Sequence, residues 1–87
     1  MAERRRRRLL QRLLSGSKNI RFTEAVACAE AFGFRLSRIN GSHHIYIHVD
    51  IPELVNLQNV NGQIKPYQVR QILQLIERYN LQMEDKA

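Results

Sequence analysis

The sequence is poor in the residues that define several classes of protein. Its 87 residues include one cysteine, Cys28, two prolines and no tryptophan. A single cysteine excludes a disulfide framework within the chain and suits a reducing compartment. No apolar run approaches the roughly 18 residues of a membrane span. A secretory leader is not expected either, because Gln11 and Arg12 interrupt the leucines that follow the N-terminal arginines. These absences favour one small globular domain with a modest core.

Acidic side chains are scarce at the N-terminal end. Residues 1–22 contain eight basic side chains and one acidic one, whereas residues 23–87 contain six basic and seven acidic ones. The net charge of +6 therefore belongs to the leading segment. We expect residues 1–22 to form a basic arm, either extended or partly helical over its leucines. Such an arm favours polyanions through counterion release, and a merely solubilising terminus is the alternative.

The rest of the chain predicts two helices and three strands. Thr23 is a suitable N-cap for a helix that ends before Gly33. Pro66 fits the first position of a second helix, whose apolar residues keep a period near 3.6 through residue 82. Alternating apolar and polar residues predict strands over residues 34–39, 43–49 and 55–60. We therefore predict an α+β domain over residues 23–82, with two helices packed on one face of a small antiparallel three-stranded sheet in the order α-β-β-β-α. Residues 83–87 should form a loose tail.

The pair Asn40-Gly41 is a strong signal for a two-residue hairpin turn. In that register Ile39 faces Ser42. One face of the hairpin, which the helices should cover, then carries Phe34, Leu36, Ile45, Ile47 and Val49. The open face carries Arg35, Ser37, His44, Tyr46 and His48. His43 should lie on the covered side beside Arg38, and in the third strand Val55 and Leu57 should point inward.

The expected open face places possible parts of a phosphodiester site side by side. A histidine can accept or donate a proton near neutral pH, and His44 follows a glycine turn that a large ligand could approach. Arg35 and Lys65 could stabilise phosphate charge, and Tyr46 could stack on an unpaired base. The alternatives are a surface histidine bonded to its strand neighbours, a cross-strand pair for Arg35 and a solvated Lys65.

A metal site is not expected among the three histidines. His44 and His48 are four strand positions apart, about 13 Å at roughly 3.3 Å per residue. One zinc ion needs both nitrogens within about 2.1 Å. We predict neither a metal nor another cofactor.

The segments FGFRLSRINGSHHIYIH and IKPYQVRQIL resemble the HicA-type toxin family, also called YcfA-like. The resemblance covers about residues 23–82. It implies a fold like that of double-stranded-RNA-binding domains (dsRBD-like), metal-independent cleavage of messenger RNA, a bacterial cytoplasmic setting and a cognate antitoxin of the HicB type. In this family a histidine of a Gly-Ser-x-His motif is catalytic, which corresponds to His44.

The resemblance leads to a specific hypothesis about function. The chain would be the toxin of a type II toxin-antitoxin system, with His44 catalytic and with Arg35, Tyr46, His48 and Lys65 as weaker candidates for RNA contacts. Gly41 and Ser42 would be structural residues of the turn. The alternatives are a non-catalytic RNA-binding module and a domain whose open face serves mainly to bind a protein partner.

Overall fold

The computed structural model describes Gln11 and residues 20–83 of the chain. Five elements follow in the order α2 (Phe22–Ala31), β1 (Arg35–Asn40), β2 (His43–Ile47), β3 (Val55–Gln58) and α3 (Pro66–Arg78). The predicted basic arm falls almost entirely on residues 1–19, which apart from Gln11 lie outside the described residues, and so do the last four residues of the predicted tail.

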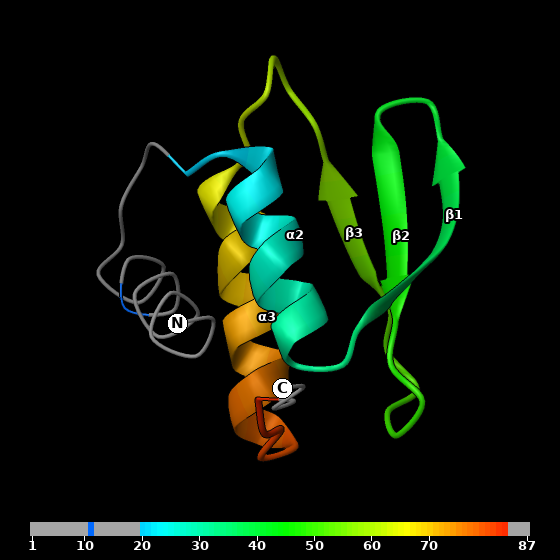
Figure 1. Ribbon diagram of the computed structural model, residues 1–87, viewed down its shortest axis with the longest axis vertical. Coiled ribbons are helices and arrows are strands. Elements are labelled where there is room, and N and C mark those ends of the chain that lie inside the picture. The colour runs from blue at the N-terminus through cyan, green and yellow to red at the C-terminus, as the bar shows by residue number, and fades with distance from the viewer. Residues whose placement is uncertain (1–10, 12–19, 84–87) are drawn as a thin grey trace.

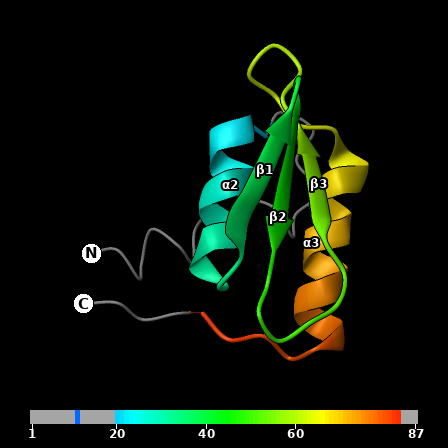
Figure 2. The same cartoon turned by 90° about the vertical axis from the view of Figure 1, so that its right-hand side faces the viewer.

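The molecule has two layers, one of helices and one of strands. The three strands form one antiparallel sheet in the order β1-β2-β3. Both helices lie on the same face of this sheet, while β1 forms the free edge farthest from them (Figure 1). The view turned by 90° shows the sheet in front and both helices behind it (Figure 2). The predicted α+β fold with two helices on one sheet face is therefore confirmed.

The helix α2 begins two residues earlier than the sequence predicts. Arg21, not Thr23, is the residue before the first helical position. The Glu24 carboxylate reaches back to accept a hydrogen bond from the Arg21 backbone N–H at 2.9 Å, which satisfies a donor at this helix end. Gly33 follows the helix with φ of 93°, the left-handed conformation expected of a glycine past a helix C-terminus. α3 likewise ends earlier than predicted, at Arg78.

The hairpin register differs by one residue from the predicted one. Asn40 pairs with His43, so the two-residue turn is Gly41-Ser42 and not Asn40-Gly41. Gly41 has φ of 62°, whereas Asn40 is not among the described residues with positive φ. A glycine with positive φ at the first turn position is the signature of a type II′ turn, whereas Asn-Gly turns of type I′ need positive φ at both residues. The register prediction was wrong because Gly41 can be the second residue of an Asn40-Gly41 turn or the first residue of a Gly41-Ser42 turn, and the structure has the second of these.

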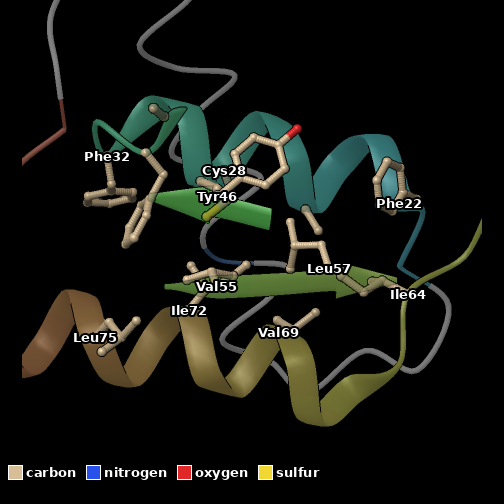
Figure 3. Packing of buried hydrophobic residues seen from close by; sticks show 14 of the residues in the cluster. Phe22, Cys28, Phe32, Tyr46, Val55, Leu57, Ile64, Val69, Ile72 and Leu75 are labelled. Atoms are coloured by element: carbon tan, nitrogen blue, oxygen red, sulfur yellow. The ribbon is translucent and has the colours of Figure 1, made fainter. Parts of the chain in front are cut away.

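The shifted register exchanges the two faces of β2. Tyr46, predicted to face solvent, is 4% exposed, and its ring points into the layer between sheet and helices (Figure 3). His44 also lies on the helix side. Ile47 and Val49, predicted to be buried, are 45% and 92% exposed. His43 lies on the open face, where its ring contacts Asn56 of β3. A slip of one residue turns every side chain of a strand to the opposite face.

A bulge in β1 limits the effect of the slip on that strand. The pairing shifts between Leu36 and Arg38, which leaves Ser37 as the extra residue. Phe34 therefore still points into the core, where it is fully buried as predicted. Leu36 lies opposite Tyr46 yet remains 45% exposed, because β1 extends beyond the helices.

The core fills the space between the helices and strands β2 and β3. Val55 and Leu57 of β3 are fully buried, as predicted, and face Val69 and Ile72 of α3 (Figure 3). Further buried residues come from α2 and from the segments flanking the strands: Ile20, Phe22, Ala25, Cys28, Ala29, Ala31, Phe32, Ile51, Ile64 and Leu75.

Candidate active site

His44 sits at the end of the sheet where the β1–β2 turn lies. It is the second residue of β2 and stands between Ile39 of β1 and Leu57 of β3. Its imidazole packs on the ring of Phe22 at the start of α2, with ring centroids 4.7 Å apart and ring planes tilted by 58°. The residue is half-buried. The contact with Phe22 restricts the orientation of the imidazole while part of the residue remains in contact with solvent.

Backbone hydrogen bonds tie three segments together around His44. The β3–α3 loop contacts the hairpin turn through the Asn59 N–H, which donates to the Ser42 carbonyl at 3.0 Å. The same loop contacts α2 through the Gly62 carbonyl, which accepts from the Phe22 N–H at 2.9 Å. The Asn59 side chain in turn accepts from the Gly62 N–H at 2.8 Å. These bonds hold the backbone of Phe22 in place, and the His44 imidazole packs on the ring of this residue.

Positive charge gathers at this end of the molecule. Both helices begin here, at the same end as the hairpin turn, in both views (Figures 1 and 2). The residues that precede their first turns are Arg21 and Lys65, both exposed cations. The N-terminal end of a helix also carries partial positive charge. The first turn of α3 contains no acidic residue, whereas that of α2 contains Glu24, whose carboxylate accepts from the Arg21 backbone N–H. The start of α3 is therefore the part of this end that most favours an anion such as a phosphate diester.

His43 offers a second imidazole on the opposite face of β2. Its Nδ1 lies 3.0 Å from Oδ1 of Asn56, within hydrogen-bond distance. His43 and His44 are thus adjacent in the chain but separated by the sheet itself.

The other candidate residues lie away from His44. His48 follows the far end of β2, where its Nδ1 accepts from the Asp50 N–H at 3.0 Å and its ring meets the edge of Phe34. The Arg35 guanidinium donates to the carbonyl of Glu30, in the last turn of α2, and to that of Phe34, just before β1. The structure therefore brings Lys65 to the same end as His44 and leaves Arg35 and His48 at the other.

Tyr46 is part of the core rather than of an open surface. Burial raises the pKa of its hydroxyl, and the nearby negative charge of Glu30 adds to that rise. A ring that is 4% exposed is not available to stack on a base. The prediction that Tyr46 faces outward was wrong for the same reason as the hairpin register.

The sequence of the chain matches a known family. The family described as the HicA toxin of bacterial toxin-antitoxin systems matches residues 22–77. The chain belongs to the HicA toxin family. The match spans every described strand and both helices except the last residue of α3, and it includes His44 and Lys65. No curated protein sequence matches this HicA toxin closely enough to be compared with it.

Membership of the HicA family establishes the general role of the chain. It is the toxin component of a toxin-antitoxin pair, a class whose members are generally ribonucleases. A cognate antitoxin and an RNA target follow at the same level of generality. Within the described residues of this HicA toxin, no three His, Cys, Asp or Glu side chains are placed so that they could share a metal ion. Neither described helix has the length and apolar character that would let it cross a membrane.

Two residues near this site were missed by reasoning from the sequence of this HicA toxin. Tyr67, in the first turn of α3, is 54% exposed. Gln68 beside it is 3% exposed, and its side-chain oxygen accepts from the Gln58 backbone N–H at 3.0 Å. The helical period that identifies Val69 and Ile72 as core residues places Tyr67 outside the apolar stripe, so its exposure could have been predicted. The burial of Gln68 depends on the end of β3 and leaves no signal in the sequence.

Proposed function

We propose that this HicA-family toxin is a metal-independent endoribonuclease that cleaves messenger RNA in the bacterial cytoplasm, with His44 as its catalytic residue and no cofactor. The observation that carries the proposal is the family match over residues 22–77. The position of His44 supports it: a half-buried imidazole rests on Phe22 at the end of the molecule where exposed cations precede both helices. Orientation by packing and a nearby positive field are what a proton-transfer residue acting on a phosphate diester needs.

The chemistry assigned to His44 is proton transfer at the ribose. As a general base, the imidazole removes the proton from a 2′-hydroxyl, and the resulting oxygen attacks the adjacent phosphorus. The bond from phosphorus to the 5′-oxygen of the next nucleotide breaks, and that oxygen takes up a proton, which the imidazolium can return. The products are a 2′,3′-cyclic phosphate and a free 5′-hydroxyl, and no water or metal-bound hydroxide enters the bond-breaking step.

The supporting residues surround His44 at the turn end of the molecule. Lys65 contributes positive charge for the RNA backbone, and Arg21 occupies the equivalent position before α2. Gly41 permits the turn through its positive φ, and the Ser42 carbonyl holds the β3–α3 loop. Arg35, Tyr46 and His48 are not included, because their side chains are committed to other contacts or buried. We also propose that the HicB-type antitoxin inhibits the toxin by covering this end.

A non-catalytic RNA-binding module is the alternative that the experiment must separate. Purified wild type, His44→Ala and the matched control His43→Ala are incubated with a 5′-labelled unstructured transcript in the presence of EDTA. We expect wild type and His43→Ala to cleave, with 2′,3′-cyclic phosphate ends, and His44→Ala to lose at least about 100-fold in rate, the scale of general acid–base catalysis. Circular dichroism checks that each variant is folded.

The results distinguish the candidate mechanisms clearly. Undiminished cleavage by folded His44→Ala removes His44 from the mechanism, and loss confined to His43→Ala assigns catalysis to the opposite face of β2. RNA binding without cleavage by any of the three proteins supports the binding module. Cleavage abolished by EDTA contradicts the metal-independent mechanism.

A further inference from the structure

Tyr67 is an exposed aromatic residue with no packing role that accounts for it. It occupies the first turn of α3 and is 54% exposed, while its neighbours Gln68 and Val69 are both buried. Burial of Tyr46 removes the aromatic residue that the sequence suggests for base stacking. Among the described aromatic residues Tyr67 and Tyr79 are exposed, and Tyr67, in the first turn of α3, lies at the same end of the molecule as the hairpin turn that precedes His44.

Cations flank Tyr67 on α3. Lys65 lies two residues before it and Arg70 three residues after it, and both are exposed. Residues three apart on a helix lie on neighbouring positions of its surface, so Arg70 is close to Tyr67. The described structure contains no acidic residue between Val55 and Ile76. An aromatic ring between basic side chains is the combination that proteins use to bind single-stranded nucleic acid, with the base on the ring and the phosphates on the cations.

Hydrogen bonds connect the Tyr67 side chain to the strand that neighbours His44. The Tyr67 hydroxyl accepts from Nε2 of Gln68 at 3.4 Å, and Oε1 of the same Gln68 accepts from the Gln58 N–H at 3.0 Å. Gln58 lies opposite His43 on β2, and its Nε2 donates to the Ser42 hydroxyl at 3.3 Å. The buried Gln68 therefore restrains the tyrosine relative to the turn and to β2. A restrained ring loses little conformational freedom when it binds a base.

From these contacts we propose that Tyr67 forms a stacking platform for one unpaired base of the single-stranded RNA substrate, next to the nucleotides that reach His44. The inference rests on the proposed ribonuclease function, because it assigns part of that substrate's binding site. Lys65 and Arg70 hold the flanking phosphates, and the ring selects single strands, since a base paired within a duplex is not free to stack on it. Tyr67 is thus a substrate-binding residue, and proton transfer stays with His44.

The experiment measures binding separately from cleavage. The full chain is titrated into a fluorescein-labelled, unstructured 2′-O-methyl oligonucleotide, which lacks the attacking hydroxyl. Wild type is compared with Tyr67→Ala, Tyr67→Phe and the matched control Tyr79→Ala at the opposite end of α3. We expect Tyr67→Ala to weaken binding by about 5- to 150-fold, the range found for loss of one base–aromatic stack, and the other two to stay within about threefold. Circular dichroism confirms that each variant is folded.

An abasic scan makes the test specific for stacking. Each nucleotide of the oligonucleotide is replaced in turn by an abasic one. We expect the difference between wild type and Tyr67→Ala to disappear when one particular base is missing. Wild-type affinity of Tyr67→Ala for the intact oligonucleotide, or the same penalty at every abasic position, overturns the proposal. The proposal is also overturned if Tyr67→Ala binds RNA like wild type but binds the antitoxin more weakly, because Tyr67 would then belong to a protein interface.

Cleavage of unmodified RNA is measured in parallel, so that the two hypotheses fail separately. Cleavage by wild type together with unchanged binding by Tyr67→Ala contradicts the platform and leaves the ribonuclease intact. A stacking penalty at Tyr67 without cleavage by wild type supports the platform and contradicts the catalytic proposal.

Discussion

The register of the hairpin places two neighbouring residues of β2 on opposite faces of the sheet. Tyr46 is 4% exposed and points into the core, whereas Ile47 is 45% exposed and faces the open side of the sheet. The register suggested by Asn40-Gly41 reverses these assignments. Tyrosine, isoleucine and threonine all favour strands, so replacing each residue by threonine changes strand propensity little and the cost reports side-chain burial.

Because Tyr46 and Ile47 are buried to different extents, the two substitutions should lower the free energy of unfolding by different amounts. A tyrosine buries about 150–250 Å², which at about 25 cal/mol per Å² corresponds to about 4–6 kcal/mol. Because threonine restores part of this, we expect Tyr46→Thr to lower the free energy of unfolding by about 3–5 kcal/mol, as for other aromatic residues truncated in cores. Ile47 is only half-buried, so Ile47→Thr should cost about 1 kcal/mol or less. A small domain has a total stability near the lower end of about 5–15 kcal/mol, so Tyr46→Thr should leave it barely folded.

Urea denaturation followed by circular dichroism measures this difference. With a slope of about 1 kcal/mol per molar urea, the midpoint should fall by about 3 M or more for Tyr46→Thr and by about 1 M or less for Ile47→Thr. Equal costs would contradict the assignment of the faces of β2, and a larger cost at Ile47 would show that the faces are assigned the wrong way round. The position of His44 on the helix side would then be wrong as well.

Three further predictions concern other parts of the fold. Gln68→Ala should cost about 1–3 kcal/mol in urea denaturation, because the Gln58 N–H loses its acceptor, and an unchanged midpoint would mean that this hydrogen bond contributes nothing. The Tyr79 hydroxyl lowers the pKa of Glu53, and Glu53 raises that of Tyr79. The stabilisation they share should be complete above the unfolded Glu pKa of about 4.3 and below the unfolded Tyr pKa of about 10. The difference in thermal midpoint between wild type and Tyr79→Phe should therefore shrink as the pH falls below about 4 or rises above about 10, and a constant difference would contradict the linkage. Burial raises the pKa of the Cys28 thiol to about 12, so at pH 8 a thiol reagent should react with Cys28 only as fast as the domain opens, and reaction at the rate of a free thiol would contradict its burial.

The order of elements was predictable from the sequence because each element has a local cause. The helical period after Pro66 and the glycine at position 33 set α3 and the end of α2. Val55 and Leu57 were assigned to the core by simple alternation, and both are fully buried. Such patterns depend on neighbours in the chain, which a sequence displays directly.

The face of β2 was not predictable, because two turns compete for Gly41. A turn at Asn40-Gly41 would place Ile45 and Ile47 on the face that the helices cover, whereas the turn at Gly41-Ser42 places His44 and Tyr46 there. The apolar character of the isoleucines favours the first turn, but the structure has the second. The Phe22 ring, which covers His44, and the bulge at Ser37 are features of the assembled fold. Neither leaves a signal in the six residues around the turn.

The candidate site was only partly predictable for the same reason. The motif that carries His44 could be recognised in the sequence, and Lys65 could be named before the helix that it precedes. That Lys65 and His44 share one end, and that Arg35 instead binds carbonyls in and after the last turn of α2, follows from the packing of helices on the sheet.

The central claim is that the toxin acts through the imidazole of His44, and paired expression in bacteria tests it most directly. Wild type, His44→Ala and His43→Ala are expressed from the same inducible promoter without antitoxin, and growth is followed alongside protein level. We expect wild type and His43→Ala to arrest growth and His44→Ala, present at a comparable level, to permit it. Growth arrest by His44→Ala as complete as that by wild type would contradict the claim.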